Sequence, residues 1–345
     1  ANNADEIGFI GGGQCNCAKA SNCYATVGGG CCNSVTGGSS FIGGGRKNLA
    51  SGTGEVVGGG YHNCATGDYA TVGGGHSNCA CGSHASILGG KHNHARGVCS
   101  TIGGGFALSA YNKNDTIVGG CNNRSCVDAI YGGHSFIGAG IGNYTVTGAG
   151  IIVGGTDNST SGVHGIVVGG HTNTAAASAF VGGGSGNTAS AVHSVVGGGC
   201  SNIAKCVCSF VGGGYLNYAC GDFTTIGGGT TNIAAGNCAF IGGGYGNRAP
   251  GTTATVGGGE ANCACDGCST VAGGYRNIAC CDFSFVGGGY QNLSKGTYST
   301  LAGGQYGCIV ASYGGIGGGR CNHVCADYGF IGAGCCNCIC DTGFC

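Results

Sequence analysis

Apolar and small residues recur along this chain with a period of fifteen, and within each period they alternate with polar residues. The segments 63–77, 78–92 and 93–107 each begin with Asn and carry Ala at the third position and Gly at the fifth. A small residue follows at position 8, an aliphatic residue at position 10 and a glycine-rich stretch after it. Self-similarity of this kind is typical of repeat architectures, so the fold is predicted from the unit.

The aliphatic residue at position 10 recurs from Ile10 to Ile331 in 22 copies. Eighteen of the 21 intervals are 15 residues long, and the other three are 17, 20 and 14. The leading Asn is present in 20 copies and is replaced by Leu108 and Gly307 in the other two. We therefore expect a single solenoid over residues 1–345 instead of several globular domains, with an irregular stretch or loop at 106–187.

The local pattern within the unit has a period of two, which is typical of strands. Positions 1, 3 and 5 share one face with positions 8 and 10, whereas positions 2, 4 and 9 point the other way. β-branched residues at positions 9 and 10 favour a strand, and the glycines favour a turn. Each unit therefore predicts two short strands and two turns, and the chain predicts an all-β fold: a parallel β-solenoid (β-roll) of about 22 coils with 15 residues per coil. The Asn at position 1 would stack in an amide ladder.

Position 9 is apolar although it points away from the small residues of the predicted core. An apolar stripe on an outer face marks an interface, and we expect it to pack against another chain. An alternative is that the solenoid folds its own third side over this row. The phenylalanines of the row are Phe9, Phe41, Phe136, Phe180, Phe210, Phe240, Phe285 and Phe330.

Composition narrows the classes of function. Gly supplies 85 of 345 residues, charged residues only 7%, and there is one Pro, which excludes collagen. Gly interrupts every apolar run, so we expect no membrane insertion. Lys and Arg total 12 against 13 Asp and Glu, which gives no basic excess for nucleic acid. No catalytic, cofactor-binding or metal-binding set stands out, and we expect a structural protein that is not an enzyme.

The unit resembles the YadA-like head repeat of trimeric autotransporter adhesins, which runs Ala-x-Ala-x-Gly-x-x-Ser-x-Ala-Ile-Gly. The segments 63–74 (NCATGDYATVGG) and 48–59 (NLASGTGEVVGG) match it almost position by position. The resemblance implies a left-handed parallel β-roll, three chains side by side and a place on a cell surface, and similar glycine-rich repeats occur in viral and phage fibres. The chain differs from the family in its period of 15, its leading Asn and its cysteine content.

The 29 cysteines predict disulfides in an extracellular repeat. Equivalent positions of adjacent coils would stack about 4.8 Å apart, which lies within the Cα range of a disulfide. We predict five coil-to-coil disulfides: Cys15–Cys32, Cys64–Cys79, Cys265–Cys280, Cys321–Cys336 and Cys325–Cys340. A metal-thiolate protein is a competing hypothesis, because Cys265 with Cys268 and Cys335 with Cys338 have the Cys-x-x-Cys spacing of zinc and iron–sulfur sites.

Five glycosylation sequons occur, at Asn114, Asn123, Asn143, Asn158 and Asn292. Four are ladder asparagines that would point inward, so Asn114, in a turn at position 7, is the candidate. Tyr215, Tyr245, Tyr275 and Tyr290 recur at position 14, where they would serve adhesion, lateral contacts or ordinary turn packing.

These observations predict a structural subunit of an extracellular, disulfide-stabilised fibre or filament on a cell or virion surface. We expect the subunit to associate with copies of itself in a trimer or filament. The chain begins at Ala1 without an apolar leader, which fits a mature secreted chain. The alternative is a trimeric adhesin or viral fibre head that binds a host ligand.

Overall fold

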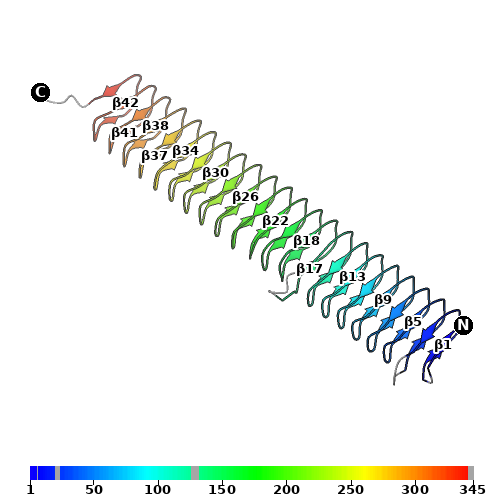
Figure 1. Cartoon of the computed structure of the whole chain (residues 1–345). Helices are drawn as coiled ribbons and strands as arrows, with labels where there is room; N and C mark the ends of the chain where they lie inside the picture. Colours follow the sequence, from blue (N-terminus) through cyan, green and yellow to red (C-terminus); the bar gives the residue numbers. More distant parts are fainter. Residues whose placement is uncertain (6, 20–23, 126–131, 341–345) are drawn as a thin grey trace. The chain divides into compact units, whose positions relative to one another are not determined.

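The computed structural model describes residues 1–5, 7–19, 24–125 and 132–340, and within them every regular element is a β-strand. Two strands of two residues alternate with turns in each coil, so the chain forms a parallel β-solenoid of about 22 coils (Figure 1). This confirms the predicted fold class. The chain divides into two units, Ala1–Ala177 and Ser178–Cys345, and each is a stack of such coils.

In the first unit, one strand of a coil covers positions 2 and 3 and the other covers positions 9 and 10; in the coil that begins at Asn123, isolated bridges of Arg124 take the place of the first strand. The first strands are β1 (Asn3–Ala4), β3 (Cys17–Ala18), β5 (Ser34–Val35), β7 (Leu49–Ala50), β9 (Cys64–Ala65), β11 (Cys79–Ala80), β13 (His94–Ala95), β15 (Ser109–Ala110), β18 (Tyr144–Thr145), β20 (Ser159–Thr160) and β22 (Thr174–Ala175). The second strands are β2 (Phe9–Ile10), β4 (Thr26–Val27), β6 (Phe41–Ile42), β8 (Val56–Val57), β10 (Thr71–Val72), β12 (Ser86–Ile87), β14 (Thr101–Ile102), β16 (Thr116–Ile117), β17 (Phe136–Ile137), β19 (Ile151–Ile152) and β21 (Ile166–Val167).

The second unit repeats this arrangement. Its first strands are β24 (Thr188–Ala189), β26 (Ile203–Ala204), β28 (Tyr218–Ala219), β30 (Ile233–Ala234), β32 (Arg248–Ala249), β34 (Cys263–Ala264), β36 (Ile278–Ala279), β38 (Leu293–Ser294), β40 (Cys308–Ile309), β42 (His323–Val324) and β44 (Cys338–Ile339). Its second strands are β23 (Phe180–Val181), β25 (Val195–Val196), β27 (Phe210–Val211), β29 (Thr225–Ile226), β31 (Phe240–Ile241), β33 (Thr255–Val256), β35 (Thr270–Val271), β37 (Phe285–Val286), β39 (Thr300–Leu301), β41 (Gly315–Ile316) and β43 (Phe330–Ile331).

Within each unit, equivalent strands of successive coils pair in parallel and in register. Cys64 of β9 pairs with Cys79 of β11, and Thr71 of β10 pairs with Ser86 of β12. A third contact, which the sequence pattern did not predict, is an isolated bridge at position 14, as between Tyr61 and His76. Each coil therefore meets its neighbour along three lines.

The irregular stretch predicted at 106–187 contains the intervals of 20 and 14 residues. Residues 126–131 lie outside the described part of the chain. On either side of them the second strands keep their register, because Thr116 pairs with Phe136 and Ile117 with Ile137. The longer coil therefore leaves the pairing of β16 with β17 intact.

Left-handed backbone at positions 7, 13 and 15 reverses the chain in a typical coil. Gly60, at position 13, has φ 91°, and a Cβ there would lie 2.6 Å from Asn63 Nδ2 and would also meet the Gly75 carbonyl oxygen. Only glycine fits that position. Tyr69 at position 7 and His62 at position 15 adopt φ 60° and 58° without being glycine.

The asparagines at position 1 form the predicted ladder, and the side chain of Asn63 shows how it works. Its Nδ2 donates to the carbonyl oxygens of Gly59 at 2.8 Å and Gly75 at 2.9 Å. Its Oδ1 accepts the backbone N–H of Asn78 at 3.0 Å, while its own backbone N–H donates to Asn48 Oδ1 at 2.9 Å. The amide is buried, so each coil is joined to the next by saturated polar contacts inside the core.

The predicted facing of the unit is confirmed by burial. Ala65 at position 3 and Val72 at position 10 are fully buried, as are their equivalents in most coils. Position 8 usually holds a small residue, but Glu55 and Asp115 occupy it in two coils of the first unit and are also buried. Two carboxyl groups thus lie in a core that the pattern predicted to hold only small residues there.

Removing one ladder amide should destabilise the coils around it. Asn217→Ala would leave the carbonyls of Gly213 and Gly229 and the N–H of Asn232 without the partners that Asn217 supplies. The Gly229 carbonyl keeps the N–H of Tyr215, but the Gly213 carbonyl and the Asn232 N–H lose a partner. A buried group left without its partner costs about 1–3 kcal/mol, so we expect a loss of about 2 kcal/mol or more in urea unfolding.

The control is Asn237→Ala, at an exposed asparagine whose Oδ1 accepts the Asp222 N–H, and loss of this single exposed hydrogen bond should cost less than about 1 kcal/mol. Equal effects of the two substitutions would contradict the ladder.

Stability of the first unit should depend on the protonation of Glu55. Burial raises the pKa of this carboxyl from 4.5 to about 7, so the folded chain holds the proton more tightly than the unfolded chain. Its contribution to stability is complete below the unfolded pKa and is lost as the pH rises through about 7.

Thermal unfolding of wild type and Glu55→Gln at about pH 5 and about pH 8 measures this contribution. We expect wild type to lose more stability than the variant between the two pH values. The same loss in both proteins would show that Glu55 is not the titrating group.

Candidate functional site

The row at position 9 carries exposed phenylalanines along each unit. Phe9, Phe41 and Phe136 are exposed in the first unit, with fractions from 36% to 61%. In the second unit Phe180 is half-buried, and the other phenylalanines of the row are exposed: Phe210, Phe240, Phe285 and Phe330. No described segment of the chain covers the row, so the alternative that the solenoid folds its own third side over it is wrong.

Glycine at position 11 leaves room for the phenylalanines of the row. Each of the eight phenylalanines is followed two residues later by Gly, and a Cβ at that glycine would lie 3.3–3.8 Å from the phenylalanine Cε1. Where position 9 holds a smaller residue, position 11 can be larger: Ser86 is followed by Leu88 and Thr116 by Val118, both exposed. The rings therefore lie across the glycines. The relief of the face varies from coil to coil, because Thr71 is also followed by a glycine, whereas Ile151 is followed by Val153.

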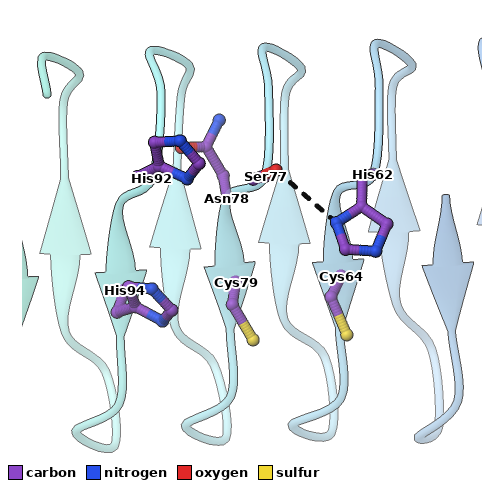
Figure 2. A pocket seen from close by; sticks show the side chains of 7 residues that line it. All are labelled: His62, Cys64, Ser77, Asn78, Cys79, His92 and His94. Carbon is purple, nitrogen blue, oxygen red and sulfur yellow. Dashed lines mark hydrogen bonds between the residues drawn. The ribbon is translucent and has the colours of Figure 1, made fainter. Parts of the chain in front are cut away.

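A second surface feature is an open groove of about 410 Å³ on the first unit. Three neighbouring strands, β9, β11 and β13, present Cys64, Cys79 and His94 in register on their outer face. The turn residues His62, Ser77 and His92 lie beside this row, and Asn78 completes the lining (Figure 2). The Nδ1 of His62 is 3.5 Å from the Ser77 hydroxyl.

His94, which lines the groove, and His76, next to the lining residue Ser77, both have a lowered pKa. Burial, together with the nearby Arg96 and His92, lowers the pKa of His94. Burial and Lys91 lower the pKa of His76, whose ring stacks on Tyr61 at a centroid distance of 5.0 Å. No carboxylate is among the lining residues, so the groove lacks the acid that orients a histidine in a Ser–His–acid arrangement.

The five predicted disulfide pairs occupy equivalent positions in adjacent coils, as expected. Cys64 and Cys79 are register partners, and backbone hydrogen bonds place the other four pairs alongside one another: Cys32 N–H to Gln14 O, Cys265 N–H to Ala279 O, Cys336 N–H to Arg320 O and Cys325 N–H to Ile339 O. All ten of these cysteines are free thiols in the structure. The disulfides themselves stay predictions.

The shortest distances between sulfur atoms join cysteines of the same coil. The sequence prediction paired cysteines of adjacent coils and did not include these contacts. Cys79 Sγ lies 2.6 Å from Cys81 Sγ, and Cys338 Sγ lies 3.1 Å from Cys340 Sγ. The neighbours Cys31 and Cys32 are 3.3 Å apart, as are Cys335 and Cys336. For Cys79 with Cys81 and for Cys338 with Cys340, the Cys-x-Cys spacing indicates the contact, because alternate residues of an extended chain share a face. The other two pairs are consecutive in the sequence.

The ladder asparagines of the sequons are buried as predicted, which leaves Asn114 as the accessible candidate. It is half-buried in a left-handed turn conformation, with φ 59°. Its glycosylation stays a prediction.

No protein-family model matches the chain, and no curated protein is similar to it. Among the described residues, no group of three or more His, Cys, Asp or Glu side chains is arranged to hold a metal ion. The described part of the chain also has no helix that is long and apolar enough to span a membrane.

Proposed function

We propose that this protein is a structural subunit of an extracellular fibre or filament, and that copies of it associate through the row at position 9. The observation that carries the proposal is the row of exposed phenylalanines at position 9, which no described segment of the chain covers. An apolar stripe on an outer face is typical of a surface that packs against a partner.

A second copy of the chain is the partner that fits this face best. Successive side chains of the row are one coil apart, about 4.8 Å, and another stack of the same coils has the same spacing. Two such rows can interdigitate along many coils, whereas an ordinary globular surface matches at only a few points. The row has no charged residue from Phe9 to Phe330, so two copies meet without charge repulsion.

The cysteines and the resemblance to adhesin heads support a location outside the cell. Disulfides persist in oxidising compartments, and stacked cysteines there would join coil to coil. The resemblance implies three chains side by side, which is one closed arrangement that would bury the row.

An adhesin or viral fibre head that binds a host ligand is the second candidate. It is favoured by a stack of exposed aromatic rings at position 7 in the second unit. Phe283, Tyr298, Tyr313 and Tyr328 follow one another at centroid distances of 4.8, 5.3 and 5.0 Å with nearly parallel planes. Such a row offers edges and hydroxyl groups to a ligand.

The self-association proposal is tested by replacing two phenylalanines of the second unit, Phe210→Ser with Phe240→Ser. Burying one phenylalanine contributes about 1.5–3 kcal/mol, so the double variant should weaken association at least about tenfold. Sedimentation velocity over a range of concentrations measures the effect. The folded unit itself should be unchanged by circular dichroism, because both side chains point outward.

The matched control is Tyr298→Ser with Tyr313→Ser, which removes two exposed rings of the same unit from position 7. It should leave association intact. Loss of association in the control but not in the Phe210 and Phe240 variant would overturn the proposed interface and favour the aromatic stack.

A further inference from the structure

Clusters of three cysteines lie on the outer face beside the first strands, and we consider one in each unit; Cys325, Cys338 and Cys340 form another of the same kind at the end of the second unit. This face is separate from the row at position 9, so the inference does not rest on the proposed function. The first cluster is Cys64, Cys79 and Cys81, and the second is Cys263, Cys265 and Cys280. In each, one cysteine has a neighbour in its own coil and another in the adjacent coil.

Cys79 is the central residue of the first cluster. It pairs in register with Cys64 of β9, and its sulfur lies 2.6 Å from that of Cys81 one step further along its own coil. Figure 2 shows Cys64 and Cys79 side by side on adjacent strands with their sulfurs directed to the same side. Cys64 and Cys79 are half-buried and Cys81 is exposed, so a small reagent can reach the cluster.

Cys265 has the same place in the second cluster. Cys263 lies two residues earlier in the same coil, and Cys280 has the equivalent position in the next coil. The backbone N–H of Cys265 donates to Ala279 O at 2.7 Å, which places Cys280 beside it. The two clusters thus share one geometry although they use different positions of the repeat.

We propose that each cluster is a site of oxidative modification, in which the central cysteine, Cys79 or Cys265, forms one disulfide with either of its two neighbours and the third cysteine keeps its thiol. Three cysteines cannot all pair, and the central one is the member that both of the others can reach. The remaining thiol is then free to react with another molecule.

Distances along the solenoid exclude a disulfide between the two outer cysteines of a cluster. Adjacent coils are about 4.8 Å apart and alternate residues of a strand about 6.6 Å, both within the Cα range for a disulfide. The outer cysteines, Cys64 with Cys81 and Cys263 with Cys280, are related by the diagonal of these two steps, roughly 8 Å, which exceeds that range.

Oxidation requires a co-reactant, which we take to be a small-molecule disulfide. The thiolate of Cys64 attacks one sulfur of the reagent, a mixed disulfide forms, and one reagent thiolate leaves. Cys79 then loses its proton and attacks the Cys64 sulfur, and the second reagent thiolate leaves. Two cysteines are oxidised to one disulfide, and the reagent is reduced to two thiols.

The thiols differ in acidity in a way that fits this order of events. A hydrogen bond from Cys79 lowers the pKa of Cys64, whereas the same contact raises the pKa of Cys79 to about 11. In the second cluster, a hydrogen bond from Cys265 lowers the pKa of Cys263, and burial raises the pKa of Cys280 to about 12. One cysteine in each cluster therefore holds the thiolate more readily than the other two.

The test is disulfide mapping of the full chain after incubation with oxidised glutathione and alkylation of the remaining thiols. In Cys64→Ser and in Cys81→Ser we expect one disulfide through Cys79. In Cys79→Ser we expect no disulfide within the cluster, with Cys64 and Cys81 both recovered carrying glutathione or the alkylating group. Cys263→Ser, Cys280→Ser and Cys265→Ser should repeat this pattern.

The matched control is Cys99→Ser, at an exposed cysteine outside both clusters, which should leave the mapped disulfides unchanged. Circular dichroism should show the same fold for all variants, because the replaced side chains face outward. A Cys64–Cys81 disulfide in Cys79→Ser, or a wild-type cluster with all three thiols unpaired after oxidation, would overturn the proposal. The second cluster gives an independent result if Cys79→Ser does not fold.

Discussion

The buried asparagine at position 1 is the contact on which the coil depends. Its side-chain N–H groups donate to two glycine carbonyls, one in the turn before it and one in the turn after it, and its oxygen accepts the N–H of the next asparagine. One side chain therefore closes its own coil and joins it to the neighbouring one. A thin core of Ala and Val cannot supply this order by itself, because hydrophobic contact has no direction. The ladder gives the stack its register, and glycine at position 13 leaves the space that the amide needs.

The outward-facing positions take no part in the asparagine ladder, so they can hold residues that bind or react. Positions 2, 4, 7, 9 and 14 face solvent and hold residues as different as Cys, His, Arg, Tyr and Phe without changing the coil. The row at position 9 and the thiol clusters of the first strands use different faces of the same units. A fibre subunit could therefore associate through one face and be chemically modified on another.

Much of the fold was predictable because the period of fifteen and the alternation within it set which residues face inward. Val72, Ala65 and Asn63 lie where the pattern placed them, and Phe41 and Phe240 are exposed as expected. The bridge at position 14 and the left-handed conformation of Tyr69 were not predictable, because stacking on the adjacent coil imposes them and residue type does not encode them. The buried Glu55 also departs from the pattern, since its neighbours in the stack are small.

The surfaces were predictable only in part. The sequence indicated the apolar row and the stacked cysteines, but the 2.6 Å approach of the Cys79 and Cys81 sulfurs depends on how two side chains of one coil turn toward each other. The groove beside His94 likewise forms only when three coils stack in register. The stacking brings turn residues such as His62 and His92 next to the strand residues Cys64, Cys79 and His94.

The central claim, that copies of the chain pack through the row at position 9, is tested most directly by electron cryomicroscopy of the purified full chain. The account predicts assemblies of two or more copies in which the Phe210 and Phe240 rings of one copy are buried against another copy. Single-chain particles at all concentrations, or copies joined through a different face with the row left in solvent, would contradict it.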